Sequence, residues 1–111
     1  MKIVKRKEFL AMPANTVFCK FEPYVFGELM IKGNSCGGEM YTDFFCLTIN
    51  DAVDFEDSVD FIDQCDLAFN NDIAMDFETE CRDGLFDDDE LYAVWNKEDI
   101  QQLIGRLKKC L

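Results

Sequence analysis

The chain has 111 residues, of which 49% are hydrophobic, and a formal net charge of −12. This length predicts one domain, and the hydrophobic content supports a folded core, which excludes a wholly disordered chain. The net charge opposes direct binding to nucleic acid, whose backbone is itself a dense array of negative charge. No apolar run approaches the roughly 18 residues that a membrane span needs.

The first third of the chain predicts a strand, a helix and two further strands. Residues 8–12 are good helix formers stopped by a proline, and residues 16–21 are rich in β-forming side chains. Residues 26–32 predict the next strand, and the glycine-rich segment 33–38 predicts a hairpin loop. Residues 41–49 are either a third strand or the start of a buried helix, because the periodicity of so short an apolar run does not distinguish the two.

The middle of the chain predicts an amphipathic helix followed by a strand. Asn50 is a suitable N-cap for the helix, and Ser58 is an alternative cap for a start near Val59. Residues 73–80 alternate apolar with acidic side chains, as a half-exposed antiparallel strand requires. The predicted apolar stripe of the helix recurs at spacings of three or four and consists of Ala52, Phe55, Val59, Ile62, Cys65 and Phe69.

The end of the chain predicts a turn, a strand and a second amphipathic helix. Residues 82–84 form the turn, residues 91–95 the strand, and Asn96 with Asp99 a near-match to a capping box. The apolar stripe of this helix is Ile100, Leu103, Ile104, Leu107 and Leu111. The order of elements predicts an α+β fold for residues 1–111, a single small domain with a mostly antiparallel sheet and two main helices packed on one face.

The sequence contains no catalytic or metal-binding motif. It has no histidine, which removes the commonest general base and the commonest metal ligand. Its six cysteines lack the close pairs of a zinc site, and its acidic clusters lack the twelve-residue calcium loop. We therefore expect no enzyme, no metal and no cofactor. With a charged N-terminus that lacks an apolar signal run, the widely spaced cysteines fit reduced thiols in a cytoplasm.

The acidity is concentrated in the middle of the chain. Residues 39–90 contain eighteen acidic residues and one basic residue, Arg82, for a net charge of −17. Within this block, the stretch DAVDFEDSVDFIDQCD has an aspartate at every third position from Asp51 to Asp66. On a helix each of these aspartates is offset from the last by about 60°, so they wind around the axis.

Two interpretations of this acidic belt remain open. One is a solvated face that serves solubility. The other is a polyanionic surface that attracts the basic groove of a nucleic-acid-binding protein. A belt without lysine or arginine lowers helix stability by a few tenths of a kcal/mol per like-charged pair, and this cost favours a functional reason for it. Phe61 projects off the apolar stripe and would act as a partly exposed anchor. The candidate partner-binding residues are Asp54, Glu56, Asp57, Asp60, Phe61, Asp63, Asp87, Asp88 and Asp89.

Two blocks carry a resemblance to a known group of proteins. EFLAMPANTVF at residues 8–18 and RDGLFDDDELYAVW at residues 82–95, followed by a final amphipathic helix, resemble small acidic proteins of unassigned function encoded by bacteriophages and prophages. The motif residues are turn and core residues, so the resemblance implies a shared fold and identifies no site. A phage origin would favour interference with a host system, by analogy.

Three functional hypotheses follow. The first is a non-enzymatic, phage-encoded inhibitor that occupies a basic surface of a host defence or nucleic-acid-binding protein in the bacterial cytoplasm. The second is a homo-oligomer, a homodimer or larger, that sequesters a nucleotide-type small molecule with Arg6, Arg82 or Arg106 in a cleft between subunits. The third is a structural or assembly protein whose acidity serves solubility alone.

Overall fold

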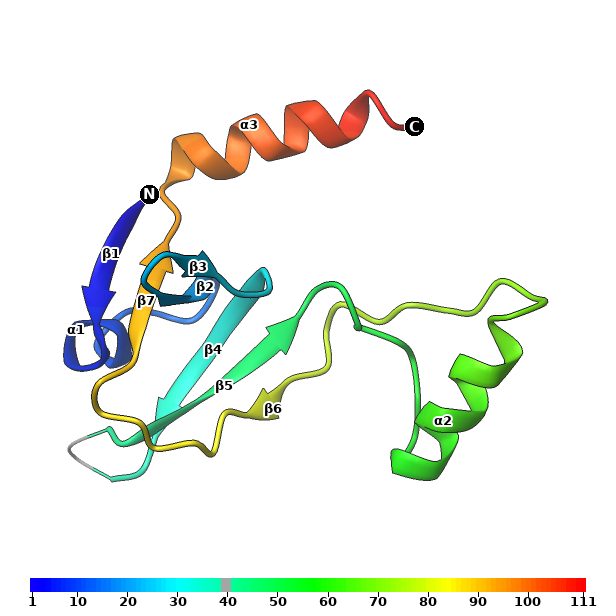
Figure 1. The fold of residues 1–111 in the computed structure, drawn as a ribbon, viewed down its shortest axis with the longest axis horizontal. Helices are drawn as coiled ribbons and strands as arrows, with labels where there is room; N and C mark the ends of the chain where they lie inside the picture. Colours follow the sequence, from blue (N-terminus) through cyan, green and yellow to red (C-terminus); the bar gives the residue numbers. More distant parts are fainter. Residues whose placement is uncertain (39–40) are drawn as a thin grey trace.

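A twisted antiparallel sheet forms the body of the molecule (Figure 1). The computed structural model describes residues 1–38 and 41–111 and has the predicted α+β class. The sheet follows the order β1-β7-β2-β4-β5-β6, and β3 pairs with β2. Its strands are β1 (Lys2–Lys5), β2 (Thr16–Glu22), β3 (Val25–Phe26), β4 (Met30–Cys36), β5 (Asp43–Thr48), β6 (Cys81–Arg82) and β7 (Leu91–Val94). The helices are α1 (Arg6–Leu10), α2 (Ser58–Leu67) and α3 (Lys97–Lys108).

The first and last strands of the chain are neighbours in the sheet. Strand β1 pairs antiparallel with β7, and β7 pairs antiparallel with β2, so that Val4 lies opposite Tyr92 and Phe18 opposite Val94 (Figure 1). This long-range pairing brings together residues that local sequence patterns do not connect.

The core lies where α1 covers one face of this sheet. The ring of Phe9, on α1, is parallel to the ring of Tyr92 with centroids 3.9 Å apart. Phe18 and Phe44 pack around this pair, and both are fully buried. Burial of aromatic rings dominates the energetics of a small core, so α1, although only five residues long, contributes a central part of it.

The strands of the first half of the chain differ from the prediction in their boundaries. The segment predicted as one strand, 26–32, is divided between β3 and β4, because Phe26 turns back to pair with Phe21 in a tight hairpin. The predicted loop 33–38 begins as strand: β4 continues through a bulge between Lys32 and Ser35 before the chain turns. The antiparallel β4–β5 pairing confirms a hairpin connection, of which residues 39–40 lie outside the described residues.

The ambiguous segment 41–49 is a strand, β5, and not a helix start. Helix α2 begins at Ser58, which confirms the later of the two predicted starts; its N-cap is Asp57, one residue before the predicted alternative cap. Asp51 and Asp54 therefore precede the helix, and the acidic belt is not one continuous helical surface.

The strand predicted at residues 73–80 is wrong. Only Met75 forms a bridge, with Val53. The short strand β6 begins at Cys81, one residue before the turn predicted at 82–84, and includes the first residue of that turn. The alternating pattern favoured a half-exposed strand, but the backbone of this segment has no neighbouring sheet edge, because β6 occupies the edge beside β5.

Helix α3 has the predicted capping box: Asn96 accepts a hydrogen bond from the Asp99 N–H, and Asp99 accepts one from the Asn96 N–H. The prediction that the two main helices pack on one face of the sheet is wrong. Neither α2 nor α3 buries any of its residues, and both project from the sheet in Figure 1. In the part of the chain that the structure describes, no helix has the length and apolarity to cross a membrane.

Candidate functional site

The turn that follows β6 is tied to the start of β5 by a buried carboxylate. The Asp43 side chain is fully buried. It accepts hydrogen bonds from the Phe44 and Gly84 N–H groups and from the Arg82 guanidinium, whose Nε lies 3.0 Å from Asp43 Oδ2. Burial alone would raise the pKa of Asp43, but the donors from Gly84, Phe44 and Arg82 outweigh it and lower this pKa. The carboxylate is therefore held in its charged form.

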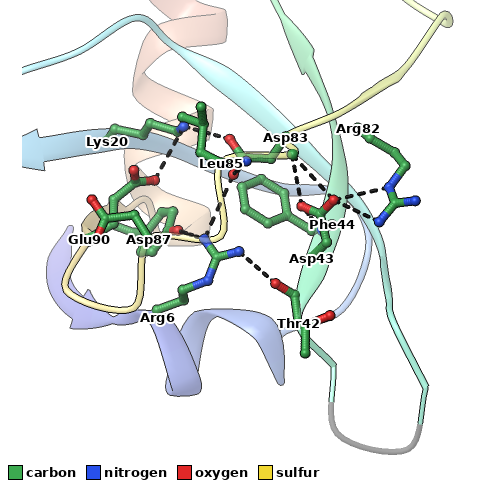
Figure 2. Close-up of polar contacts among 12 residues, drawn as sticks. Arg6, Lys20, Thr42, Asp43, Phe44, Arg82, Asp83, Leu85, Asp87 and Glu90 are labelled. Atoms are coloured by element: carbon green, nitrogen blue, oxygen red, sulfur yellow. Dashed lines mark hydrogen bonds and ion pairs between the residues drawn. The ribbon is translucent and has the colours of Figure 1, made fainter.

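A second buried carboxylate, Asp83, follows β6 and contacts basic side chains of β2 and α1. Lys20 Nζ lies 2.5 Å from Asp83 Oδ1 and 3.3 Å from Glu90 Oε1. The Arg6 guanidinium lies 3.8 Å from Asp83 Oδ2 and donates hydrogen bonds to the Tyr92 hydroxyl at 2.6 Å and to the Thr42 carbonyl at 2.7 Å. Figure 2 shows Arg6, Lys20 and Arg82 converging on this pair of aspartates.

The charged groups of this buried ion network are paired with one another. Burial is costly for charges unless they are paired and hydrogen-bonded, and Arg6 is only 3% exposed because its donors are directed inward. Within the described residues, Glu90 Oε1 is the buried side-chain oxygen that lacks a hydrogen-bond partner, although it lies beside Lys20. The network fixes the segment between β6 and β7 onto the sheet, and it leaves Arg6 unable to reach a ligand in a cleft between subunits.

Sequence reasoning missed this network. It treated the RDG turn as a loop and gave no role to Asp43, Asp83 or Lys20. One signal was present: Arg82 is the single basic residue among the eighteen acidic residues of positions 39–90. A lone cation in such a block is expected to have a specific carboxylate partner. Asp43 lies 39 positions away from Arg82 in the sequence, so local patterns do not identify it as that partner.

A cleft of about 620 Å³ separates α2 from the sheet. Its walls are Leu47 and Thr48 of β5 on one side and Phe55, Phe61 and Ile62 on the other. The rings of Phe55 and Phe61 meet edge to face with centroids 5.1 Å apart. Phe61, predicted as a partly exposed anchor, is half-buried and faces this cleft.

Residues 51–80 form an acidic lobe that projects from the sheet (Figure 1). This acidic lobe contains eleven acidic residues and no basic residue. Its two ends are joined by backbone hydrogen bonds from the Asp54 N–H to the Ala74 carbonyl and from the Asp76 N–H to the Ala52 carbonyl. Almost the whole net charge of the protein is thus presented on one extension of the fold.

The outer face of α2 is both acidic and apolar. Val59 is 69% exposed, Ile62 at the rim of the cleft is 60% exposed, and Leu67 is half exposed. Asp63 and Asp66 lie among them on the same side of the helix, opposite the half-buried Phe61 and Gln64. Large apolar side chains thus lie exposed between carboxylates on this face of α2.

The structure divides the predicted binding residues into two groups. Asp57 caps α2 by accepting a hydrogen bond from the Asp60 N–H, Asp60 accepts one from the Glu56 N–H, and Asp87 accepts one from the Asp89 N–H. These three carboxylates stabilise local structure. Among the described residues, five predicted side chains are exposed and make no hydrogen bond or ion pair: Asp54, Glu56, Asp63, Asp88 and Asp89.

The two predicted acidic patches do not come together. Asp87 and Asp89 line a separate cleft of about 460 Å³ beside the β2–β3 hairpin, with Lys20 and Glu90. In Figure 1 this segment lies near α1 at one end of the sheet, whereas α2 lies at the other end. The residues of the acidic lobe are therefore the coherent candidate site, and the 87–89 segment is a distinct surface.

Within residues 1–38 and 41–111 there is no group of three or more carboxylate or cysteine side chains arranged to hold a metal ion. Each of the six cysteines has a free thiol, and burial with the nearby Asp83 charge raises the pKa of Cys46 to about 11. Comparisons with protein-family models, with curated proteins and with solved structures find no match to this chain.

Proposed function

We propose that this protein is a non-enzymatic acidic binding protein whose acidic lobe occupies a basic surface on another protein. The observation that carries the proposal is the composition and position of residues 51–80: eleven carboxylates, no cation, and a projecting helix with exposed Val59 and Ile62. Such a lobe attracts a Lys/Arg-rich groove over distance, and its apolar side chains supply contact area once the partner has arrived.

The resemblance to small acidic phage and prophage proteins gives the proposal its biological setting. In that setting the partner is a bacterial defence protein or a nucleic-acid-binding protein, and the lobe competes with nucleic acid for its groove in the bacterial cytoplasm. Direct binding of nucleic acid by this chain is disfavoured by its net charge.

The structure shapes the variant that tests the proposal. Replacing Asp57 or Asp60 would disturb the start of α2, because both accept backbone hydrogen bonds there. The exposed carboxylates Asp54, Glu56 and Asp63 have no such role, so their triple replacement by lysine reverses the charge of the lobe while leaving α2 capped. A matched control replaces Glu8, Glu22 and Glu28 by lysine, which gives the same charge change away from the lobe.

The measurement is capture of proteins from a bacterial lysate on the immobilised chain, followed by affinity measurements with each purified captured protein. A basic protein should bind wild type and the control variant, lose affinity for the Asp54/Glu56/Asp63 variant, and dissociate as salt screens the charges. Nucleic acid should displace it. Equal affinity of the wild type and the lobe variant would sink the proposal.

A further inference from the structure

The outer part of helix α3 is a second uncovered surface, and its chemistry is the reverse of the acidic lobe. At the base of the helix Ile100 and Leu103 are half-buried, and Leu103 lines a cleft with Cys19 and Trp95. Residues 100–111 contain Arg106, Lys108 and Lys109 and no acidic side chain. Beside these cations, Ile104 is 48% exposed and Leu107 is 55% exposed. An amphipathic helix normally buries its apolar stripe against another element, and this one buries no residue within its own chain.

The exposed faces of α2 and α3 match each other. On α2, Val59, Ile62 and Leu67 alternate with Asp63 and Asp66. On α3, the exposed stripe of Ile104 and Leu107, with Leu111 just past the helix end, is flanked by Arg106 on one side and Lys108 on the other. The helices are also similar in length, with ten residues in α2 and twelve in α3, or about 15 and 18 Å.

The two faces do not meet within one chain. Figure 1, which is viewed down the shortest axis of the molecule, places α3 along one edge and α2 at a distant corner. Each chain therefore offers an anionic apolar face and a cationic apolar face that remain uncovered. Two copies related by a two-fold axis satisfy both faces at once, because the contact of α3 with α2 is made reciprocally.

We infer that the protein associates with a second copy of itself through α3 of each chain docked on the outer face of α2 of the other. The inference does not depend on the proposed host partner. The docked α3 covers the outer face of α2 around Val59, Ile62 and Leu67, whereas Asp54 and Glu56 lie before the helix and stay outside this contact. Self-association and partner binding thus use overlapping but different parts of the acidic lobe.

Charge reversal on each face provides a specific test by sedimentation velocity and light scattering. Wild type should have the mass of two chains at low salt and dissociate at high salt. Arg106→Glu/Lys108→Glu should be monomeric, because two acidic faces repel. Asp63→Lys/Asp66→Lys should be monomeric for the opposite reason. Mixing these two monomeric variants should restore a dimer, because each then supplies the face that the other lacks.

Matched controls separate this contact from a general effect of charge or apolarity. Lys5→Glu/Lys7→Glu makes the same charge change at the exposed β1–α1 end and should remain dimeric. Leu107→Ser should lose the dimer, while Val25→Ser, at an equally exposed position of β3, should keep it. Circular dichroism shows that each variant is folded. A monomeric wild type, a dimer that survives both charge reversals, or a mixture that stays monomeric would each overturn the inference.

Discussion

The fully buried carboxylate of Asp43 is paired with Arg82, a side chain that is itself 52% exposed. The pair joins the start of β5 to β6 at an N–O distance of 2.9 Å from Arg82 Nη2. The two partners are therefore not equivalent. Arg82 can be solvated when it is alone, whereas Asp43 depends on its protein donors. This asymmetry decides what removal of each partner does to the fold.

We expect Asp43→Asn to lower the free energy of unfolding by about 2 kcal/mol, because it removes the charge from buried hydrogen bonds to Gly84, Phe44 and Arg82. Arg82→Ala should cost less, about 1 kcal/mol or below, since half of its side chain is already in water. Urea unfolding followed by circular dichroism measures both. Equal losses for the two variants would show that Asp43 is not held by its backbone donors.

The pH dependence of stability should follow the lowered pKa of Asp43. Because the folded-state pKa lies below the unfolded value of about 3.9, the stabilisation is fully present above about pH 4 and is lost as pH falls through the folded pKa. The free energy of unfolding should therefore decrease below about pH 4. Asp43→Asn should show a shallower decrease in that window, measured by urea unfolding at a series of pH values. An unchanged slope would contradict this origin of the acid sensitivity.

The stacked pair of Phe9 and Tyr92 should dominate the core. Phe9→Ala should lower the free energy of unfolding by about 3–5 kcal/mol, since it empties a fully buried aromatic site. Tyr92→Phe keeps the ring but removes the hydroxyl that accepts the hydrogen bond from buried Arg6, and should cost about 1–3 kcal/mol. Thermal unfolding by calorimetry compares the two. A larger loss of unfolding free energy for Tyr92→Phe than for Phe9→Ala would mean that the ion network contributes more to stability than the stacked rings.

The N-cap of α2 gives a local prediction. Asp57→Ala removes the acceptor for the Asp60 N–H and should destabilise α2 by about 1 kcal/mol. Because α2 buries no residue, this loss should appear as faster amide exchange in residues 58–67, with little change in β2 and β7. Asp63→Ala, which removes an exposed carboxylate of the same helix without touching its cap, is the control and should leave exchange nearly unchanged. Uniform acceleration across the sheet would mean that α2 is coupled to the core.

The sequence by itself determined the local elements whose signals lie within a few residues. The capping box at Asn96 and Asp99 predicted the start of α3. The proline after residue 12 predicted a short helix over residues 8–12, and the helix found there, α1, is shifted by two residues to Arg6–Leu10. The α+β class followed from the order of strands and helices. The concentration of acid in residues 39–90 was likewise readable from composition, since it needs no spatial information.

Only the tertiary structure decided which of these patterns are used. The alternation at residues 73–80 is typical of a strand, yet a strand needs a free neighbouring edge, and β6 takes the edge beside β5. The apolar stripes of α2 and α3 predicted packing on the sheet, yet both helices project from it. The Asp43–Arg82 and Arg6–Tyr92 contacts join residues 39 and 86 positions apart. Contacts over such separations form only when the sheet has assembled, and local propensity does not encode that assembly.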